Sequence, residues 1–117
     1  MDSTTTIGAL KSATAKFVDA REWNGYHSPK NLAMSIAIEA AEIMEHFQWY
    51  TPTESIARLE DAEERAAVAD ELADVLIYCF SFANSTGIDL SDAIFKKLDR
   101  NETRFPVERV RGRLGDE

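Results

Sequence analysis

Two pairs of acidic residues, each spaced three apart, lie inside two stretches that otherwise have the pattern of buried helices. The pairs are Glu39-x-x-Glu42 and Glu71-x-x-Asp74. On an α-helix, residues three apart lie on one face, roughly 5–6 Å from each other. Each pair therefore sets two carboxylates side by side among apolar neighbours, where unpaired charge is costly. If the two helices face each other, the pairs repel unless a cation lies between them.

The rest of the chain also has the pattern of helices, because strand-like alternation bounded by turn residues is absent from the sequence. We expect helices at about 7–22, 29–49 and 61–85, a short helix or turn at 53–59, and a last helix ending near 105. The first helix carries a 3–4-spaced apolar stripe of Leu10, Ala13, Phe17 and Ala20.

Local signals place the ends of these helices. Ser28 followed by Pro29 is an N-cap with proline at the first helical position. Thr53 is expected to cap the short helix, and Asp89 or Ser91 the last one. Gly87 suits the left-handed position after a helix. These signals separate the helices by short loops.

Four helices with short loops predict an all-α, four-helix-bundle fold in one domain of 117 residues. Residues 75–82 are apolar nearly all round, so we expect them to be buried on most sides. A small monomer covers such a helix poorly, which favours a homo-oligomer, either a dimer or a tetramer. The domain is expected to span residues 1–108, followed by a charged, loosely ordered tail over 109–117 that begins soon after Pro106.

Composition excludes several classes of function. A hydrophobic fraction of 44% and a charged fraction of 29% are typical of globular proteins, and no apolar run is long enough to span a membrane. The start, Met1 to Thr4, lacks the features of a signal peptide, so a cytoplasmic location is the default expectation. The net charge of −8 argues against non-specific binding of nucleic acid. The single Cys79 is expected to be a core residue, and one cysteine forms no intrachain disulfide.

A metal site is the interpretation that we favour for the acidic pairs. One such pair alone is best interpreted as a solvated acidic stripe, but two pairs at identical spacing on two core helices are not. Di-iron bundles use Glu-x-x-His, whereas here Glu42 is followed by Glu45, and His46 is one place too far. The two His and one Cys do not cluster as zinc ligands. An oxygen-only site for Mg²⁺, or Mn²⁺, remains.

The ordered motifs resemble the all-α nucleoside triphosphate pyrophosphohydrolases, the MazG-like group. The resemblance begins with the two acidic pairs, which 28 residues separate. The sequences at 19–23 (DAREW), 27–32 (HSPKNL), 47–49 (FQW), 71–78 (ELADVLIY) and 97–106 (KLDRNETRFP) are similar to the dCTP pyrophosphatase branch. The resemblance covers about residues 9–108, and it is the ordered set that makes it specific.

The resemblance implies a reaction as well as a fold. It implies that Glu39, Glu42, Glu71 and Asp74 bind Mg²⁺, which holds and polarises a nucleoside triphosphate while a water attacks at phosphorus. The products would be a nucleoside monophosphate and pyrophosphate, with dCTP or modified dCTP as the expected substrate and cleansing of the nucleotide pool as the role. Glu45 is a candidate for orienting or deprotonating the water, or is an ordinary exposed carboxylate.

The resemblance also implies a base pocket. Trp23 and Trp49 would line it by stacking, although without the family each is a core or interface aromatic. Asn24 and His27, in the loop beside Trp23, would contact base or sugar edges; a structural role for His27 is the alternative.

Further polar residues would contact the phosphates. Tyr78, one turn beyond Asp74, would bond a phosphate or pack on the sugar. The last helix carries Lys97, Asn101 and Arg104 on one face, where they would neutralise phosphate charge or be ordinary surface residues.

Two departures and two alternatives accompany this interpretation. Ile38 stands where many MazG-like proteins carry an extra Glu, which fits the dCTP-type branch, and Phe105 replaces a Tyr that is frequent in that branch, so a hydroxyl contact is lost. A nucleotide- or partner-binding bundle without turnover is the first alternative function. A purely structural bundle is the second, and it predicts that Mg²⁺ leaves the melting temperature unchanged.

Overall fold

The chain folds into helices joined by short connections, and the computed structural model describes residues 1–113. No strand occurs within that range, so the all-α prediction is confirmed. In chain order the elements are α1 (Ile7–Ala20), the 3₁₀-helix η1 (Asn24–Tyr26), α2 (Pro29–Glu45), α3 (Pro52–Arg58), α4 (Ala62–Thr86), α5 (Leu90–Arg104) and α6 (Val107–Val110).

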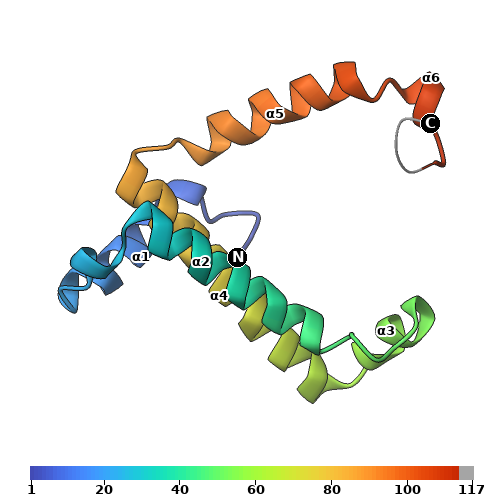
Figure 1. Cartoon of the computed structure of the whole chain (residues 1–117), viewed down its shortest axis with the longest axis horizontal. Coiled ribbons are helices and arrows are strands. Elements are labelled where there is room, and N and C mark those ends of the chain that lie inside the picture. The colour runs from blue at the N-terminus through green and yellow to red at the C-terminus, as the bar shows by residue number, and fades with distance from the viewer. Residues whose placement is uncertain (114–117) are drawn as a thin grey trace. The chain divides into compact units, whose positions relative to one another are not determined.

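The chain divides into two compact units, the first of which is Met1–Gly87. Within it, α2 runs along α4, and α1 packs on α4 near the end that leads to Gly87 (Figure 1). Leu32 is the most deeply buried large side chain, only 1% exposed, and Val18, Phe80 and Ala83 surround the same core. The second unit begins at Ile88 and holds α5 and α6. The core that positions the acidic pairs is therefore built from α1, α2 and α4.

The helices α1, α2, α3 and α5 begin at side-chain caps, and the sequence predicts those of α2 and α5. The hydroxyl of Ser28 accepts from the N–H of Asn31 at 3.2 Å, which confirms the predicted cap of α2. Asp89, one of the two expected candidates, caps α5. Thr53 does not cap α3: Thr51 does, because the Glu54 side chain returns a hydrogen bond to the Thr51 N–H at 3.0 Å and completes a capping box.

Helix ends follow equally local chemistry. Gly87 ends α4 in the left-handed conformation, with φ of 74°, as predicted. The helix α2 ends at Glu45, earlier than the expected 49, because the N–H groups of His46 and Phe47 bond back only three residues, to Ile43 and Met44. Such i to i−3 bonds tighten the last turn and stop the α-helix.

The apolar stripe that the sequence predicts on α1 is not the buried face within a single chain. Leu10 and Phe17 are 40% and 48% exposed, whereas the buried residues of α1 are Thr14 and Val18. Thr14 tolerates burial because its hydroxyl donates to the Leu10 carbonyl at 2.9 Å. The buried face of α1 is therefore rotated away from the apolar stripe, by one residue along the chain from Phe17 to Val18.

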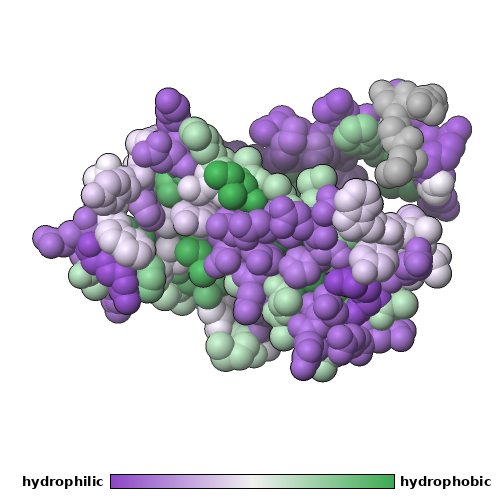
Figure 2. Space-filling model, turned by 60° about the horizontal axis from the view of Figure 1, so that its bottom comes forward, coloured by the Kyte–Doolittle hydropathy of each residue, from purple (hydrophilic) through white to green (hydrophobic). Residues whose placement is uncertain are grey.

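The apolar segment of α4 is likewise less covered than expected. Phe80 is buried, and Cys79, the expected core cysteine, is half-buried, but Leu76 and Ile77 are 46% and 44% exposed. Only α1 and α2 cover α4 closely in the described chain, so its remaining side faces outward. Figure 2 shows green patches of apolar side chains open among polar ones on one face of the molecule.

Arg58 joins α3 to the start of α4. Its guanidinium forms an ion pair with Glu64, 2.5 Å from Nη2 to Oε2, and donates from Nη1 to the Tyr50 hydroxyl at 2.8 Å. The guanidinium carbon also lies 4.4 Å from the centre of the Tyr50 ring. The cluster ties α3 and Tyr50 to the first turn of α4, across the connection that links α2 to α4.

The segment after α5 is more ordered than the sequence suggests where it is described. The helix α6 forms over Val107–Val110 and extends into the tail expected to be loosely ordered from residue 109, and the guanidinium of Arg109 donates to the Arg104 carbonyl at 3.1 Å. Residues 114–117 of the expected tail lie outside the described residues. The domain boundary at 108 stays a prediction. Across residues 1–113, no helix combines the length and apolar character needed to cross a bilayer.

Candidate active site

The packing of α2 on α4 brings the two acidic motifs together. One carboxylate oxygen each from Glu39, Glu42 and Glu71 lies within 4.8 Å of the other two. All three side chains are half-buried. The spacing within each helix determines which carboxylates share a face. The register between α2 and α4 brings these two faces together. We call these three residues the acidic cluster.

The carboxylates of the acidic cluster destabilise one another's charged forms. A hydrogen bond shared with Glu42, followed by burial and the nearby charges of Glu42, Asp74 and Glu39, raises the pKa of Glu71 to about 7. Burial and the Glu42 carboxyl also raise the pKa of Glu39. Among residues 1–113, no basic side chain forms an ion pair with any of the three. The site therefore holds negative charge that the described chain does not balance.

The acidic cluster fits a divalent cation. The Oε2 atoms of Glu39 and Glu71 are buried, and within residues 1–113 they have no hydrogen-bond partner. Buried polar atoms are nearly always paired, so two unpaired carboxylate oxygens beside a third carboxylate fit a site that binds a ligand. Oxygen-only donors suit a hard divalent cation. A cation would both pair these oxygens and cancel their repulsion.

Asp74 and Glu45 lie at the margins of the acidic cluster. Asp74 is close enough that its charge raises the pKa of both Glu39 and Glu71, but it is exposed and does not belong to the group of three. Glu45 is exposed at the last residue of α2, one turn beyond Glu42. Their expected roles, as a fourth metal ligand and as the residue that orients water, stay predictions.

The two tryptophans lie at opposite ends of α2. Trp23 precedes η1, 43% exposed and edge-on to Phe17 with 5.8 Å between ring centres. Trp49 follows α2 and is 84% exposed. The 17 residues of α2 between them rise about 25 Å. Both tryptophans are exposed, and the whole of α2 separates them along the chain.

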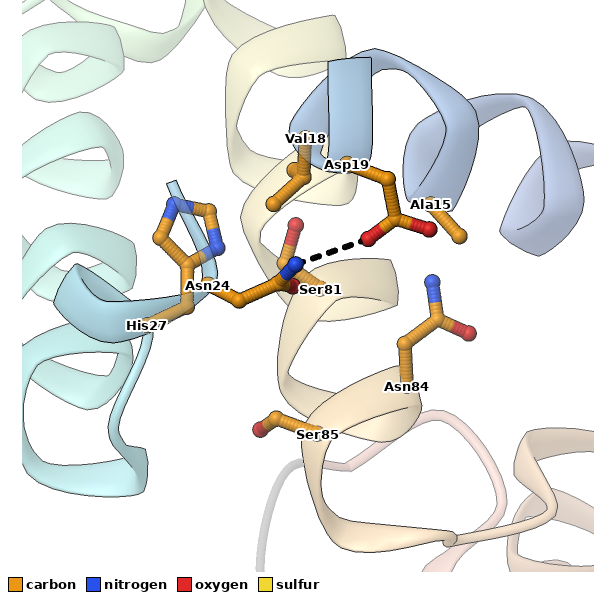
Figure 3. A pocket seen from close by; sticks show the side chains of 8 residues that line it. All are labelled: Ala15, Val18, Asp19, Asn24, His27, Ser81, Asn84 and Ser85. Carbon is orange, nitrogen blue, oxygen red and sulfur yellow. Dashed lines mark hydrogen bonds between the residues drawn. The ribbon is translucent and has the colours of Figure 1, made fainter. Parts of the chain in front are cut away.

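Asn24 and His27 line a polar pocket of about 330 Å³ beside α4 (Figure 3). Sequence reasoning missed the other polar walls of this pocket. A signal existed for one of them: Ser81 follows Asp74 by seven residues, which is two helical turns and the same face. We use the name polar pocket for the space lined by Asp19, Asn24, His27, Ser81, Asn84 and Ser85.

The remaining predicted substrate residues divide between the two units. Tyr78 is half-buried on α4, one turn from Asp74. Lys97, Asn101 and Arg104 lie on α5 in the second unit, where Asn101 is half-buried and the other two are exposed. Their contacts with a substrate stay predictions.

A sequence profile of the MazG-like family matches residues 34–113, a range that contains both acidic motifs. The chain belongs to the MazG-like family. The resemblance that the motifs suggest is thereby confirmed, and with it the family's all-α fold.

Similar proteins carry related descriptions. The dCTP pyrophosphatase 1 of Mus musculus is 37% identical over 107 residues, covering 92% of this chain and 63% of that protein. The dCTP pyrophosphatase 1 of Homo sapiens is 36% identical over 106 residues, covering 91% and 62%. The chain thus spans a little less than two thirds of the length of these relatives. The crystal structure of a pyrophosphatase from Archaeoglobus fulgidus DSM 4304 superposes with a TM-score of 0.76 at 40% identity, covering 81% of this chain and 87% of that one.

Proposed function

We propose that this MazG-like protein is a Mg²⁺-dependent nucleoside triphosphate pyrophosphohydrolase. It cleaves a nucleoside triphosphate between the α- and β-phosphates and releases the monophosphate and pyrophosphate. One observation carries the proposal: three half-buried carboxylates converge within 4.8 Å, and two of their oxygens are buried without a partner. The names of the relatives, dCTP pyrophosphatase 1, support dCTP or a modified dCTP as the substrate.

In this proposal, different side chains bind the cation, the attacking water and the substrate. Glu39, Glu42 and Glu71 hold the cation, with Asp74 as the fourth carboxylate. When bound, Mg²⁺ neutralises phosphate charge and polarises the phosphoryl group. Glu45 orients the attacking water from the end of α2. Tyr78 donates its hydroxyl to the substrate one turn further along α4.

We further propose that the protein works as a homo-oligomer, a dimer or a tetramer. Apolar side chains are exposed on α1 and α4, where Leu10, Phe17 and Ile77 border an apolar pocket of about 320 Å³. On α5, Ile94 and Leu98 lie one turn apart and are 51% and 53% exposed. A second copy would cover such surfaces and would complete the bundle. Light scattering after size-exclusion chromatography tests this, and a stable monomer would refute it.

An oligomer also explains how Trp23 and Trp49 reach one substrate. Since α2 separates them within a chain, a site that uses both draws one of them from a neighbouring copy. Lys97, Asn101 and Arg104 would supply positive charge to the phosphates in the same assembly. The expected cytoplasmic location stays a prediction.

Pyrophosphate release from a panel of deoxynucleoside and ribonucleoside triphosphates tests the activity. We expect release with Mg²⁺, none with a chelator, and none from Glu39→Gln. The ranking of the panel identifies the base. If calorimetry detects nucleotide binding but no member of the panel releases pyrophosphate, the protein is instead a nucleotide-binding bundle without turnover.

A further inference from the structure

The polar pocket contains a buried hydroxyl that no group among residues 1–113 satisfies. Ser81 is 5% exposed, and its Oγ has no hydrogen-bond partner. A buried serine in a helix ordinarily donates to the carbonyl four residues earlier, as Thr14 does with Leu10 at 2.9 Å. Ser85, one turn further along α4, bonds the Phe82 carbonyl at 3.2 Å. Ser81 is therefore kept unpaired at the wall of a pocket, which indicates a ligand.

Three further side chains of the pocket, those of Asp19, Asn24 and Asn84, present hydrogen-bond acceptors. The amide nitrogen of Asn24 donates to Oδ1 of Asp19 at 2.9 Å, and that of Asn84 donates to the Lys11 carbonyl at 2.9 Å. Both partners can only accept, so these bonds fix the orientation of each amide. The amide oxygens of Asn24 and Asn84 and the second carboxylate oxygen of Asp19 are left as acceptors. Figure 3 shows Asp19, Asn24 and Ser81 converging on one space.

The pocket continues the substrate-facing side of α4. Asp74, Tyr78, Ser81 and Ser85 follow one another at three- and four-residue spacing, so they share one face of the helix. Asp74 and Ser81 are seven residues apart, a rise of roughly 10 Å. A group that extends from the triphosphate along α4 toward η1 reaches the polar pocket, and in a nucleotide that group is the sugar and base.

We propose that the polar pocket binds the amino-bearing edge of the nucleobase and that Ser81 and Asp19 determine base specificity; this rests on the proposed pyrophosphohydrolase function. An exocyclic amino group has two N–H donors, which suit the Asp19 carboxylate and a neighbouring amide oxygen. The adjacent ring nitrogen is an acceptor and would receive a hydrogen bond from the Ser81 hydroxyl. Cytosine and adenine share this edge. Uracil and thymine have one ring N–H flanked by carbonyls. In this pocket their carbonyl oxygens would lie against other acceptors, so we expect these bases to bind more weakly.

Kinetics of pyrophosphate release with dCTP, dATP and dUTP test the proposal in Ser81→Ala and Asp19→Asn. We expect Ser81→Ala to raise KM for the preferred amino-base nucleotide about tenfold, the usual effect of one lost hydrogen bond, with kcat nearly unchanged. Asp19→Asn should lower the ratio of kcat/KM between that nucleotide and dUTP by at least about tenfold, because the new amide can donate to a carbonyl. Ser12→Ala, on the exposed side of α1, is the matched control.

Two further measurements separate this proposal from the proposed function and from a purely structural role. Binding of deoxycytidine, deoxyadenosine and deoxyuridine by calorimetry needs no catalysis, so a preference that Ser81→Ala abolishes supports the pocket even if no triphosphate is hydrolysed. Ser81→Ala should also raise the melting temperature of the ligand-free protein, since it removes an unpaired buried hydroxyl. If triphosphates are hydrolysed but both variants keep the wild-type KM values and base ranking, the pocket assignment is wrong while the function stands. If neither nucleosides nor triphosphates are discriminated by base, the assignment is also wrong.

Discussion

Glu64 and Glu71 lie two turns apart on α4, and their neighbours carry opposite charges. Glu64 faces Arg58 at 2.5 Å, with His46 at 4.0 Å from the same oxygen. Glu71 faces the carboxylates of Glu39 and Glu42. The chain balances the first charge and leaves the second unbalanced. Residue type and helix are the same, so the charge of the partners and the burial of the carboxylate oxygens distinguish the two residues.

The comparison explains why the second arrangement indicates function. A cluster of like charges lowers the stability of the metal-free fold, and such conflicts persist mainly at functional sites. The ion pair of Arg58 and Glu64 needs nothing from outside the chain. The acidic cluster needs a ligand before its oxygens are paired.

The largest expected effect is on catalysis. Glu71→Gln should lower pyrophosphate release by more than about 100-fold, the upper figure for residues that merely support a metal ligand. Glu64→Gln, the same change two turns away, should leave kcat within a few fold. Steady-state rates of pyrophosphate release with dCTP and Mg²⁺ measure both effects. Equal losses in the two variants would contradict the claim that Glu71 is functional and Glu64 structural.

The second effect is metal-dependent stability. Mg²⁺ at about 100 times its dissociation constant should stabilise the wild type by about 2.7 kcal/mol. Thermal melting should show this rise in the wild type and in Glu64→Gln but not in Glu71→Gln. A purely structural bundle predicts no rise in any of the three proteins.

The third effect is on the pH dependence of the metal-free protein. The pKa of Glu71 is raised from 4.5 to about 7, so between these values the folded protein keeps a proton that the unfolded chain releases. The free energy of unfolding should therefore fall as the pH rises through that window, and level off above it. Denaturant unfolding across this range should show a shallower fall for Glu71→Gln. Stability that rises with pH in both proteins would contradict the assignment.

The smallest effect concerns the balanced pair. Arg58→Ala should lower the free energy of unfolding by about 1 kcal/mol, since both side chains are partly exposed to water. Mg²⁺ should stabilise this variant as much as it stabilises the wild type. A loss of the Mg²⁺ effect would show that the register between α2 and α4 depends on Arg58.

Much of this molecule follows from local sequence rules. The cap at Ser28 and the left-handed Gly87 place their helix ends because capping involves only neighbouring residues. The three-residue spacing likewise places Glu39 beside Glu42 on one face. These features need no knowledge of the tertiary fold.

Other features depend on contacts between distant segments, and the sequence does not contain them in readable form. Asn84 bonds the carbonyl of Lys11 across 73 residues, and this contact helps to build the polar pocket. Helical spacing puts Asp74 on the face of Glu71, but the rotation of α4 leaves it outside the group of three. The apolar stripe of α1 is a similar case, since periodicity shows that a face is apolar but not what covers it.

Calorimetric titration of the metal-free protein with Mg²⁺ tests the central claim most directly. The acidic cluster should give the wild type and Glu64→Gln the same binding, and Glu71→Gln little or none. Equal binding in all three proteins would mean that the cation binds outside the acidic cluster. No binding in the wild type would contradict the claim that the acidic cluster binds a cation.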